Sequence, residues 1–308
     1  MTLKPTAHKP VTQDLVPSPR LTLWVRLRRF WPRVPIYGAL IVLGTIFAIP
    51  LVWLVSSSLK LESKVFTYPP EFIPNPVVFS NYSEAVTRFP FWQATKNTMV
   101  IVLACLVGNL FTVSFTAYVF ARIRFPGREP MFVFMVLATL MVPYHVYLIP
   151  QYILFRNLGW LNSNLPLTVP ALMAQSPYFI FMFRQFFRSV PREYDEAARI
   201  DGCGWFGIYW RIMLPQSLPA LGVVAIFTFI GTWNDFLAPL IYLNEQRKQT
   251  LTIAIRTYEM LASEVHLGQS SWTFILAVSV ILTIPPIVLY FVAQRYFVQG
   301  IVVSGVKG

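Results

Sequence analysis

Acidic residues that could act as acids or bases gather at one place in this chain, between Glu193 and Asp201. Glu193, Asp195 and Glu196 fall in the first turn of an expected helix, where carboxylates oppose the positive end of the helix dipole. Arg199 follows on the same helix, close enough to pair with them. A dipole and ion-pair role therefore explains these carboxylates better than an acid–base pair does.

Histidine and cysteine patterns predict neither a metal centre nor a catalytic residue. His8, His145 and His266 are widely separated, and Cys105 and Cys203 have no histidine neighbours. His145 could relay protons, but a neutral histidine bonded to a neighbouring helix is the favoured interpretation. No glycine is followed directly by lysine, so no phosphate-binding loop of the P-loop type is present. We predict no catalytic residue, no metal and no cofactor bound by this chain.

The composition is that of a membrane protein. Hydrophobic residues make up 56% of the chain and charged residues only 12%, against roughly 25% charged in soluble domains. Six runs without a charged residue are each long enough to cross a bilayer as a helix, and they are apolar throughout rather than alternating. The fold is therefore predicted to be all-α with six transmembrane helices, at 34–59, 97–121, 130–155, 157–183, 212–234 and 265–294.

Basic residues predict the orientation, because cytoplasmic segments carry the excess of Lys and Arg. Placing both termini, the turn at 122–129 and the loop that holds Glu196 on one side assigns 17 of the 25 basic residues to that side, which is then cytoplasmic. The net charge of +12 is mostly this bias, so no nucleic-acid role is expected. We divide the chain into a basic N-terminal segment (1–33), a six-helix membrane domain (34–294) and a cytoplasmic tail (295–308).

Prolines fall inside several of these runs, and proline in a membrane helix frees a carbonyl that a neighbour must satisfy. Kinks are one interpretation, and the general abundance of proline in membrane helices is the other. The residues concerned are Pro143, Pro150, Pro166, Pro170, Pro177, Pro285 and Pro286.

The loop between the fourth and fifth runs is predicted to form a helix, a bend and a second helix. Ser189 can cap the first helix and Pro191 suits its first turn. Gly202 can adopt the left-handed conformation that stops a helix. An apolar-rich stretch at 204–213 follows, and we expect Leu214-Pro215 to end it.

This loop resembles the EAA loop of the membrane subunits of binding-protein-dependent ABC importers. Every position of that motif is matched, by Glu196, Ala197, Ala198, Gly202, Ile212, Leu214 and Pro215. The resemblance implies that the loop is seated in an ATPase subunit, with Glu196 as the polar contact. Ala197 and Ala198 would allow close approach, and Gly202 would set the angle of the bend. An amphipathic helix that tethers the loop to lipid is the alternative.

Three further stretches are similar to the MalG-like permease subunits of carbohydrate importers, at 117–127, at Trp233-Asn234-Asp235-Phe236 and at 300–308. The resemblance implies a non-catalytic subunit of a bacterial or archaeal inner membrane that forms half of a sugar pathway. Its partners would be membrane lipid, a second homologous permease, an extracytoplasmic solute-binding protein and two ATPase subunits that bind ATP and Mg. The tail would contact those ATPases through Ser304, Gly305 and Lys307.

Asp235 is the acidic residue most clearly associated with a membrane span. Counting about 1.5 Å per residue from Pro215 places it some 30 Å away, near the outer interface. Asn234 and Asp235 could line the translocation pathway, since ionisable residues at depth often do. An interfacial, hydrogen-bonded structural role is the other interpretation.

Two other functions remain open from the sequence. One is a permease of an ABC importer for another class of solute. The other is a self-contained secondary transporter, for which charged or unwound sites near the bilayer midplane are expected. Five of the six runs offer no such site.

Overall fold

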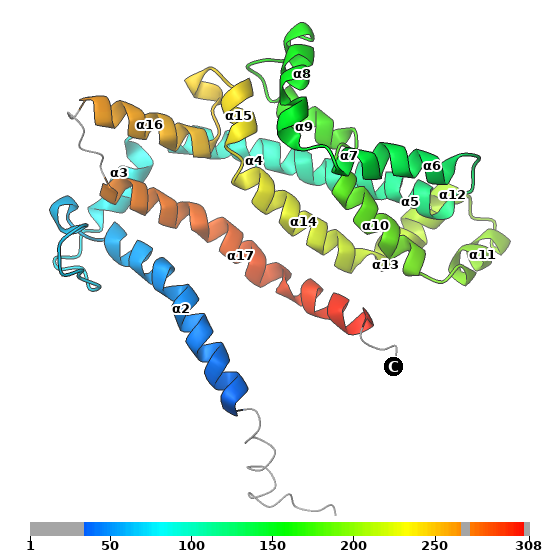
Figure 1. The fold of residues 1–308 in the computed structure, drawn as a ribbon, viewed down its shortest axis with the longest axis horizontal. Helices are drawn as coiled ribbons and strands as arrows, with labels where there is room; N and C mark the ends of the chain where they lie inside the picture. The colour runs from blue at the N-terminus through cyan, green and yellow to red at the C-terminus, as the bar shows by residue number, and fades with distance from the viewer. Residues whose placement is uncertain (1–33, 266–271, 305–308) are drawn as a thin grey trace, which may run out of the picture. The chain divides into compact units, whose positions relative to one another are not determined.

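The computed structural model describes residues 34–265 and 272–304, and its regular elements there are helices joined by loops (Figure 1). No strand occurs within those ranges, so the predicted all-α fold is confirmed. The chain divides into two compact units at Trp53. The described part of the first unit is the beginning of α2 (Val34–Ser58), a helix without a charged residue. The end of α2 and all other described helices belong to the second unit.

Four helical segments are long and apolar enough to cross a membrane, namely Val34–Ser58, Phe91–Arg122, Leu165–Ser189 and Trp272–Gln294. Two further helix pairs pass the same test but are bent, by 99° between Leu140 and Tyr144 and by 77° between Gln216 and Leu218. The described residues thus contain four candidate spans, or six when each bent pair counts as one. The six predicted runs correspond to these six segments.

The sharper bend lies between α7 (Ala138–Leu140) and α8 (Tyr144–Asn157), at Pro143. Proline cannot donate a helix hydrogen bond and disfavours helical geometry in the residue before it. Of the two interpretations of the prolines, a kink therefore holds at Pro143, whereas Pro150, Pro170, Pro285 and Pro286 lie inside continuous helices. Pro177 likewise starts α10 (Pro177–Ser189), after a break from α9 (Leu165–Leu172).

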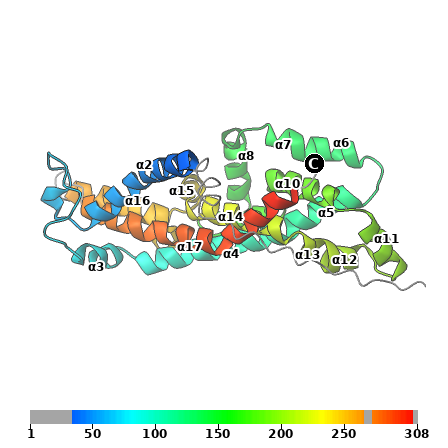
Figure 2. The same ribbon diagram turned by 90° about the horizontal axis from the view of Figure 1, so that it is seen from below.

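The second span of the sequence lies at the centre of the larger unit. It consists of α4 (Phe91–Val107), a π-helical turn at Gly108–Val113 and α5 (Ser114–Arg122). Its first half packs against α9, α14 (Leu218–Trp233) and α16 (Leu251–Val265), and its second half against α10. Figures 1 and 2 show α4 and α5 continuing one another, with α14 and α17 (Trp272–Ser304) alongside.

Close packing of two spans explains the glycine within the π-helical turn. A Cβ atom added to Gly108 would lie 2.5 Å from the backbone of Ala171, closer than any side chain tolerates. Asn109, the next residue, is buried and connects three spans. Its amide donates to Thr228 Oγ1 (3.0 Å), and its Oδ1 accepts a hydrogen bond from Ser176 Oγ (2.7 Å).

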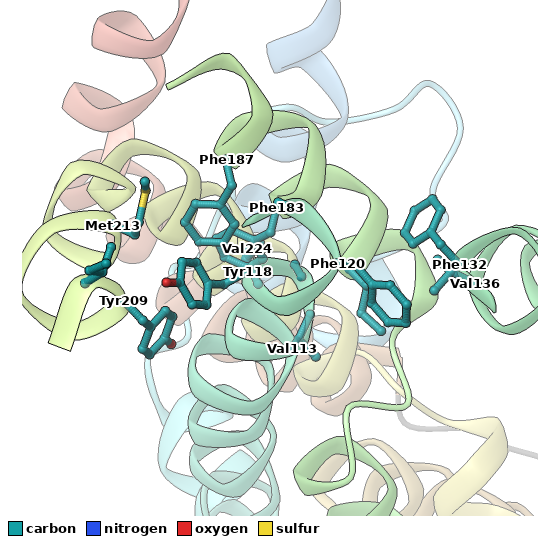
Figure 3. Close-up of a cluster of buried hydrophobic side chains, with 14 of the residues drawn as sticks. Val113, Tyr118, Phe120, Phe132, Val136, Phe183, Phe187, Tyr209, Met213 and Val224 are labelled. Atoms are coloured by element: carbon teal, nitrogen blue, oxygen red, sulfur yellow. The ribbon is translucent and has the colours of Figure 1, made fainter. Parts of the chain in front are cut away.

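Two clusters of buried apolar side chains stabilise the larger unit. The first joins α5 and α10 to α6 (Arg128–Phe132) and to the loop after residue 200, with Tyr118, Phe183 and Phe187 fully buried (Figure 3). Arg184 supports this cluster, since its guanidinium lies 3.9 Å from the Phe132 ring and 2.6 Å from Glu129. The second cluster joins α3 (Ser80–Thr87), α4, α14, α16 and α17.

Side chains from distant parts of the sequence cap the N-termini of two helices in the larger unit. Glu62 accepts hydrogen bonds from the backbone N–H groups of Trp272 and Thr273, at 2.7 and 3.1 Å, and so caps α17. Thr98 Oγ1 accepts from the N–H of Leu251 and caps α16 in the same way (2.9 Å). Each of these bonds joins segments that are more than 150 residues apart in the sequence.

The close approach at Gly108 leads to a prediction with an internal control. Gly108→Ala should destabilise the protein by about 1–3 kcal/mol, because the backbone of α9 must move to admit a methyl group. Gly231→Ala, in α14, adds the same methyl group where nothing lies within 4 Å, and should leave stability unchanged or slightly higher. Thermal unfolding of the two purified variants in detergent measures the difference. Equal melting temperatures would contradict the close approach.

Candidate coupling site at residues 191–216

The loop that matches the motif folds as two short helices joined by a tight bend. The first is α11 (Glu193–Ile200), and Gly202 follows it with a φ of +81°. Cys203 N–H donates to Ala198 C=O (2.9 Å) and Gly202 N–H to Arg199 C=O (3.0 Å). These bonds close the helix end as a left-handed glycine allows. The predicted conformation of Gly202 is confirmed.

The predicted cap of α11 is wrong. Ser189 is the last residue of α10, and its hydroxyl donates to the carbonyl of Phe186 in that helix (2.7 Å). The residue before α11 is Arg192, which forms no side-chain cap. Val190 is extended between the two helices, as the residue before a proline prefers, so Ser189 lies too early to cap α11.

The second half of the loop also departs from expectation. It consists of α12 (Trp205–Ile208), a π-helical turn at Tyr209–Met213 and α13 (Leu214–Gln216). The predicted stop at Leu214-Pro215 is wrong, because Pro215 lies in the first turn of α13, where its missing N–H removes no necessary bond. The helix ends one residue later, and the bend before α14 is at Ser217.

The two faces of α11 differ in exposure. Glu196 and Ala197 are exposed, and Ile200 beside them is 87% exposed, which is unusual for an isoleucine. Ala198 is only 5% exposed and packs in the first apolar cluster. Of the two motif alanines, Ala197 is therefore available to a partner, whereas Ala198 allows α11 to lie close to its own core.

A hollow of about 690 Å³ separates α11 from the second half of the loop. Ile212 and Leu214 turn partly into the apolar cluster, while Pro215 is exposed at the edge. Four of the seven motif residues line the hollow, so the bend brings together positions far apart in the motif. The lining includes Tyr194, Ala197, Ala198, Asp201, Cys203, Arg211, Ile212 and Pro215.

A buried ion pair fastens α11 to α5. Arg122 Nη1 lies 3.3 Å from Asp195 Oδ2, with 2% and 9% of the two side chains exposed. Arg122 Nη2 also donates to the carbonyl of Val190, at 2.6 Å. Burial raises the pKa of the Asp195 carboxyl, and Arg122, followed by Arg199 and Arg192, opposes that rise. The cation that α5 supplies thus favours the charged form of Asp195 against the effect of burial.

Two further bonds fasten the second half of the loop to the same helix. Tyr118 Oη donates to the carbonyl of Trp205 (3.0 Å), and the hydroxyls of Ser114 and Tyr209 are 2.8 Å apart. Ser114, Tyr118 and Arg122 are spaced four residues apart and form one stripe on α5. The role of these three residues in holding the loop was not predicted from the sequence. The signal that could have indicated it is a stripe of three hydrogen-bonding residues in an otherwise apolar span.

The other predicted site residues lie elsewhere. Asp235 Oδ1 accepts from the N–H of Ala238 (3.4 Å) at the start of α15 (Leu237–Tyr242), and its carbonyl accepts from Thr252 Oγ1 (2.8 Å). Its neighbour Asn234 is exposed and bonds to Ile230 in its own helix. These contacts are local and structural, and a role in the pathway stays a prediction.

The last four residues of the predicted tail, 305–308, lie outside the described residues, and the rest of it continues α17. Gly305 and Lys307 are among those four, and Ser304 is the last helical residue of α17. No helix end marks the boundary placed at residue 294. Among the described residues, no group of three His, Cys, Asp or Glu side chains could hold a metal ion.

Comparison with known families shows which family the chain belongs to. Residues 114–303 match the family described as the binding-protein-dependent transport system inner membrane component. The chain belongs to this family. The match begins at the first residue of the α5 stripe and contains the whole loop, so the resemblance drawn from the motif is confirmed. Members of this family are the membrane components of transport systems, not their catalytic subunits.

Several relatives in this family are sugar or polyol phosphate permeases. The diacetylchitobiose uptake permease DasC of Streptomyces coelicolor is 29% identical, over 91% of this chain and 98% of its own length. NgcG of the same organism, named for the same uptake, is 31% identical over 84% of both chains. The sn-glycerol-3-phosphate permease UgpE of Yersinia pestis is 34% identical, over 87% and 94%.

Solved structures share the fold. A chain of the bacterial ABC transporter that imports the acidic polysaccharide alginate superposes with a TM-score of 0.74 at 24% identity, over 88% of this chain and 98% of that one. A chain of the alginate transporter in complex with its alginate-bound periplasmic protein gives 0.61 at 15% identity, over 89% and 96%.

The buried pair gives a second prediction. Arg122→Met should cost about 3–5 kcal/mol of stability, because it leaves the Asp195 carboxylate buried without its partner. Arg122→Met/Asp195→Leu, which removes both charges, should recover much of that loss. Arg188→Met, at an exposed position of α10 without an ion pair, should change stability by less than about 0.5 kcal/mol. Thermal unfolding of the purified variants is the measurement.

The same variant should be sensitive to pH with a definite sign. Without Arg122, the folded-state pKa of Asp195 rises further above its unfolded value, so stability is retained at low pH and lost as pH rises through that pKa. The deficit of Arg122→Met relative to wild type should therefore be smaller near pH 5 than near pH 8. A deficit independent of pH would show that Asp195 does not carry the effect.

Proposed function

We propose that the chain is one permease subunit of an ATP-driven sugar uptake system, for a disaccharide or oligosaccharide. It would form half of the translocation pathway beside a second homologous permease. Its loop at 191–215 would couple it to one of two ATPase subunits, and a solute-binding protein would deliver the sugar on the other side of the membrane. Six spans with both termini in the cytoplasm are part of this proposal.

The observation that best supports the coupling role is that one side of α11 is exposed and the other is buried. One side carries exposed Glu196, Ala197 and Ile200, and the other carries buried Asp195 and Ala198. A surface helix with an exposed isoleucine beside a carboxylate is suited to a protein partner, since both the charge and the apolar area are free. The hollow beside it is large enough to admit side chains of that partner.

Movement of the loop would reach the membrane along two routes. The first is covalent, through α10 and α14, which precede and follow the loop. The second is through the stripe on α5, which contacts both halves of the loop. An ATPase that displaced α11 would therefore pull on three spans together. This arrangement suits a rigid-body transition of the membrane helices.

The names of the relatives support a sugar as the solute. DasC and NgcG are diacetylchitobiose permeases, and the structural neighbour belongs to a transporter of a polysaccharide. UgpE, which is 34% identical, supports the alternative of a polyol phosphate. Membership of a binding-protein-dependent family argues against a self-contained secondary transporter.

Two variants of the loop test the coupling. Glu196→Lys reverses the charge on the exposed face of α11, and Gly202→Val places a β-branched side chain where the left-handed conformation costs about 1–2 kcal/mol or more. Both should reduce co-purification of the ATPase subunit or uncouple its hydrolysis from uptake, while leaving the second permease bound. The measurement is ATPase retention together with uptake in proteoliposomes.

A matched control makes this test specific. Gly204→Val introduces the same side chain two residues away, where φ is −72° and nothing lies within 4 Å of a Cβ. This control should behave as wild type. Full uptake by Glu196→Lys and Gly202→Val would mean that the loop is not the coupling element.

The solute is tested separately. The transporter, reconstituted with its own binding protein and ATPase, should take up a labelled disaccharide such as diacetylchitobiose only when ATP is supplied inside. Uptake of sn-glycerol 3-phosphate instead would replace the sugar by the polyol phosphate. Uptake that persists without ATP would contradict the ABC mechanism.

A further inference from the structure

A second hollow, on the opposite side of α11, is surrounded by arginine. It has a volume of about 260 Å³, and four guanidinium groups face two carboxylates around it. The side chains around the hollow thus carry a net charge of +2. The hollow has room for a small polar group. Its lining consists of Arg122, Arg124, Arg192, Asp195, Glu196, Arg199 and Trp205.

Interactions within the chain neutralise only part of this positive charge. Asp195 is committed to Arg122, and Arg199 lies over the Trp205 ring, 3.8 Å from its centroid. Arg124 and Arg192 are exposed, and no carboxylate in the described part of the chain forms an ion pair with either. Guanidinium groups that repel one another around a hollow favour an anion, and their fork geometry matches a phosphate.

The position of the hollow indicates where such an anion would come from. The helical segment that ends at Arg122 begins at Phe91, and its 32 residues extend about 48 Å. That exceeds the roughly 40–45 Å of a bilayer with its headgroups, so Arg122 and Arg124 reach the level of the lipid phosphates. Trp205 on the rim is typical of that interface, and the excess of basic residues assigns this end to the cytoplasmic leaflet, which is rich in anionic lipid.

We propose that this arginine-lined hollow binds the phosphate of an anionic membrane lipid. The lipid would then contact both α5 and α11, next to the buried pair that joins them. Its charge would offset the repulsion among the four arginines. This proposal assumes that the protein resides in a membrane. It does not depend on the proposed transport of a sugar.

The test measures lipid binding directly. Native mass spectrometry of the full-length chain in detergent, titrated with phosphatidylglycerol or phosphatidylcholine, should show clear preference for phosphatidylglycerol. Arg124→Gln/Arg192→Gln should weaken phosphatidylglycerol binding by about 25-fold, at about fivefold for each cation. Both side chains are exposed and neither forms an ion pair in the described part of the chain, so the variant should keep the wild-type fold, with only a small shift in melting temperature from the weaker attraction between Arg192 and Asp195.

Matched controls and competitors separate the outcomes. Arg188→Gln/Arg247→Gln removes two exposed positive charges that do not line the hollow, and should bind phosphatidylglycerol as wild type does. Displacement of phosphatidylglycerol by millimolar inorganic phosphate would overturn the lipid in favour of a free anion. Equal lipid binding by wild type and Arg124→Gln/Arg192→Gln would also overturn it, and loss of ATPase retention in that variant would then assign the hollow to the protein partner.

Glu196 lines the hollow, whereas Gly202 does not. A failure of the lipid test would therefore leave the Gly202→Val test of the coupling role untouched. Conversely, loss of lipid preference is measured on the chain without its partners. It would therefore be seen whatever solute the transporter carries.

Discussion

The buried ion pair between Arg122 and Asp195 is the constraint on which the placement of the loop depends. A carboxylate buried in an apolar cluster is costly unless a cation and hydrogen bonds accompany it. Here the cation comes from the end of one span and the carboxylate from a loop between two others. The first helix of the loop therefore cannot leave α5 without exposing or orphaning a charge, and this holds its outer face in one orientation.

This constraint continues into the membrane part through α5 itself. The stripe that holds the loop leads directly into the π-helical turn at Gly108–Val113. There Gly108 touches the backbone of α9, and Asn109 bonds to Ser176 and Thr228. These contacts join the π-helical turn to α9, to Ser176 just before α10, and to Thr228 in α14. The polar contacts of the second span thus bind together the spans that enter and leave the loop.

Much of this could be predicted from the sequence, because the relevant signals are local. Continuous apolar runs predict the helices, Gly202 predicts a left-handed residue, and Pro143 predicts a break. The errors concern competition between neighbours: Ser189 bonds within α10 rather than capping α11, and Pro215 begins a helical turn rather than ending one. The contacts of the α5 stripe with the loop could not be predicted, since they join residues 68 to 95 positions apart.

The irregular turns suggest why such a structure could change shape in a defined way. π-helical turns occur in the second span, in the segment after α6 and in the loop, and the first and last of them adjoin the α5 stripe. A π turn shifts the hydrogen-bond register by one residue, so a return to regular helix rotates everything beyond it. The buried ion pair resists gradual displacement of α11, because partial separation would leave both charges desolvated. Under the proposed coupling role, movement at the loop would therefore be transmitted as a concerted rotation of α5 with α10 and α14, rather than absorbed by flexing at the membrane surface.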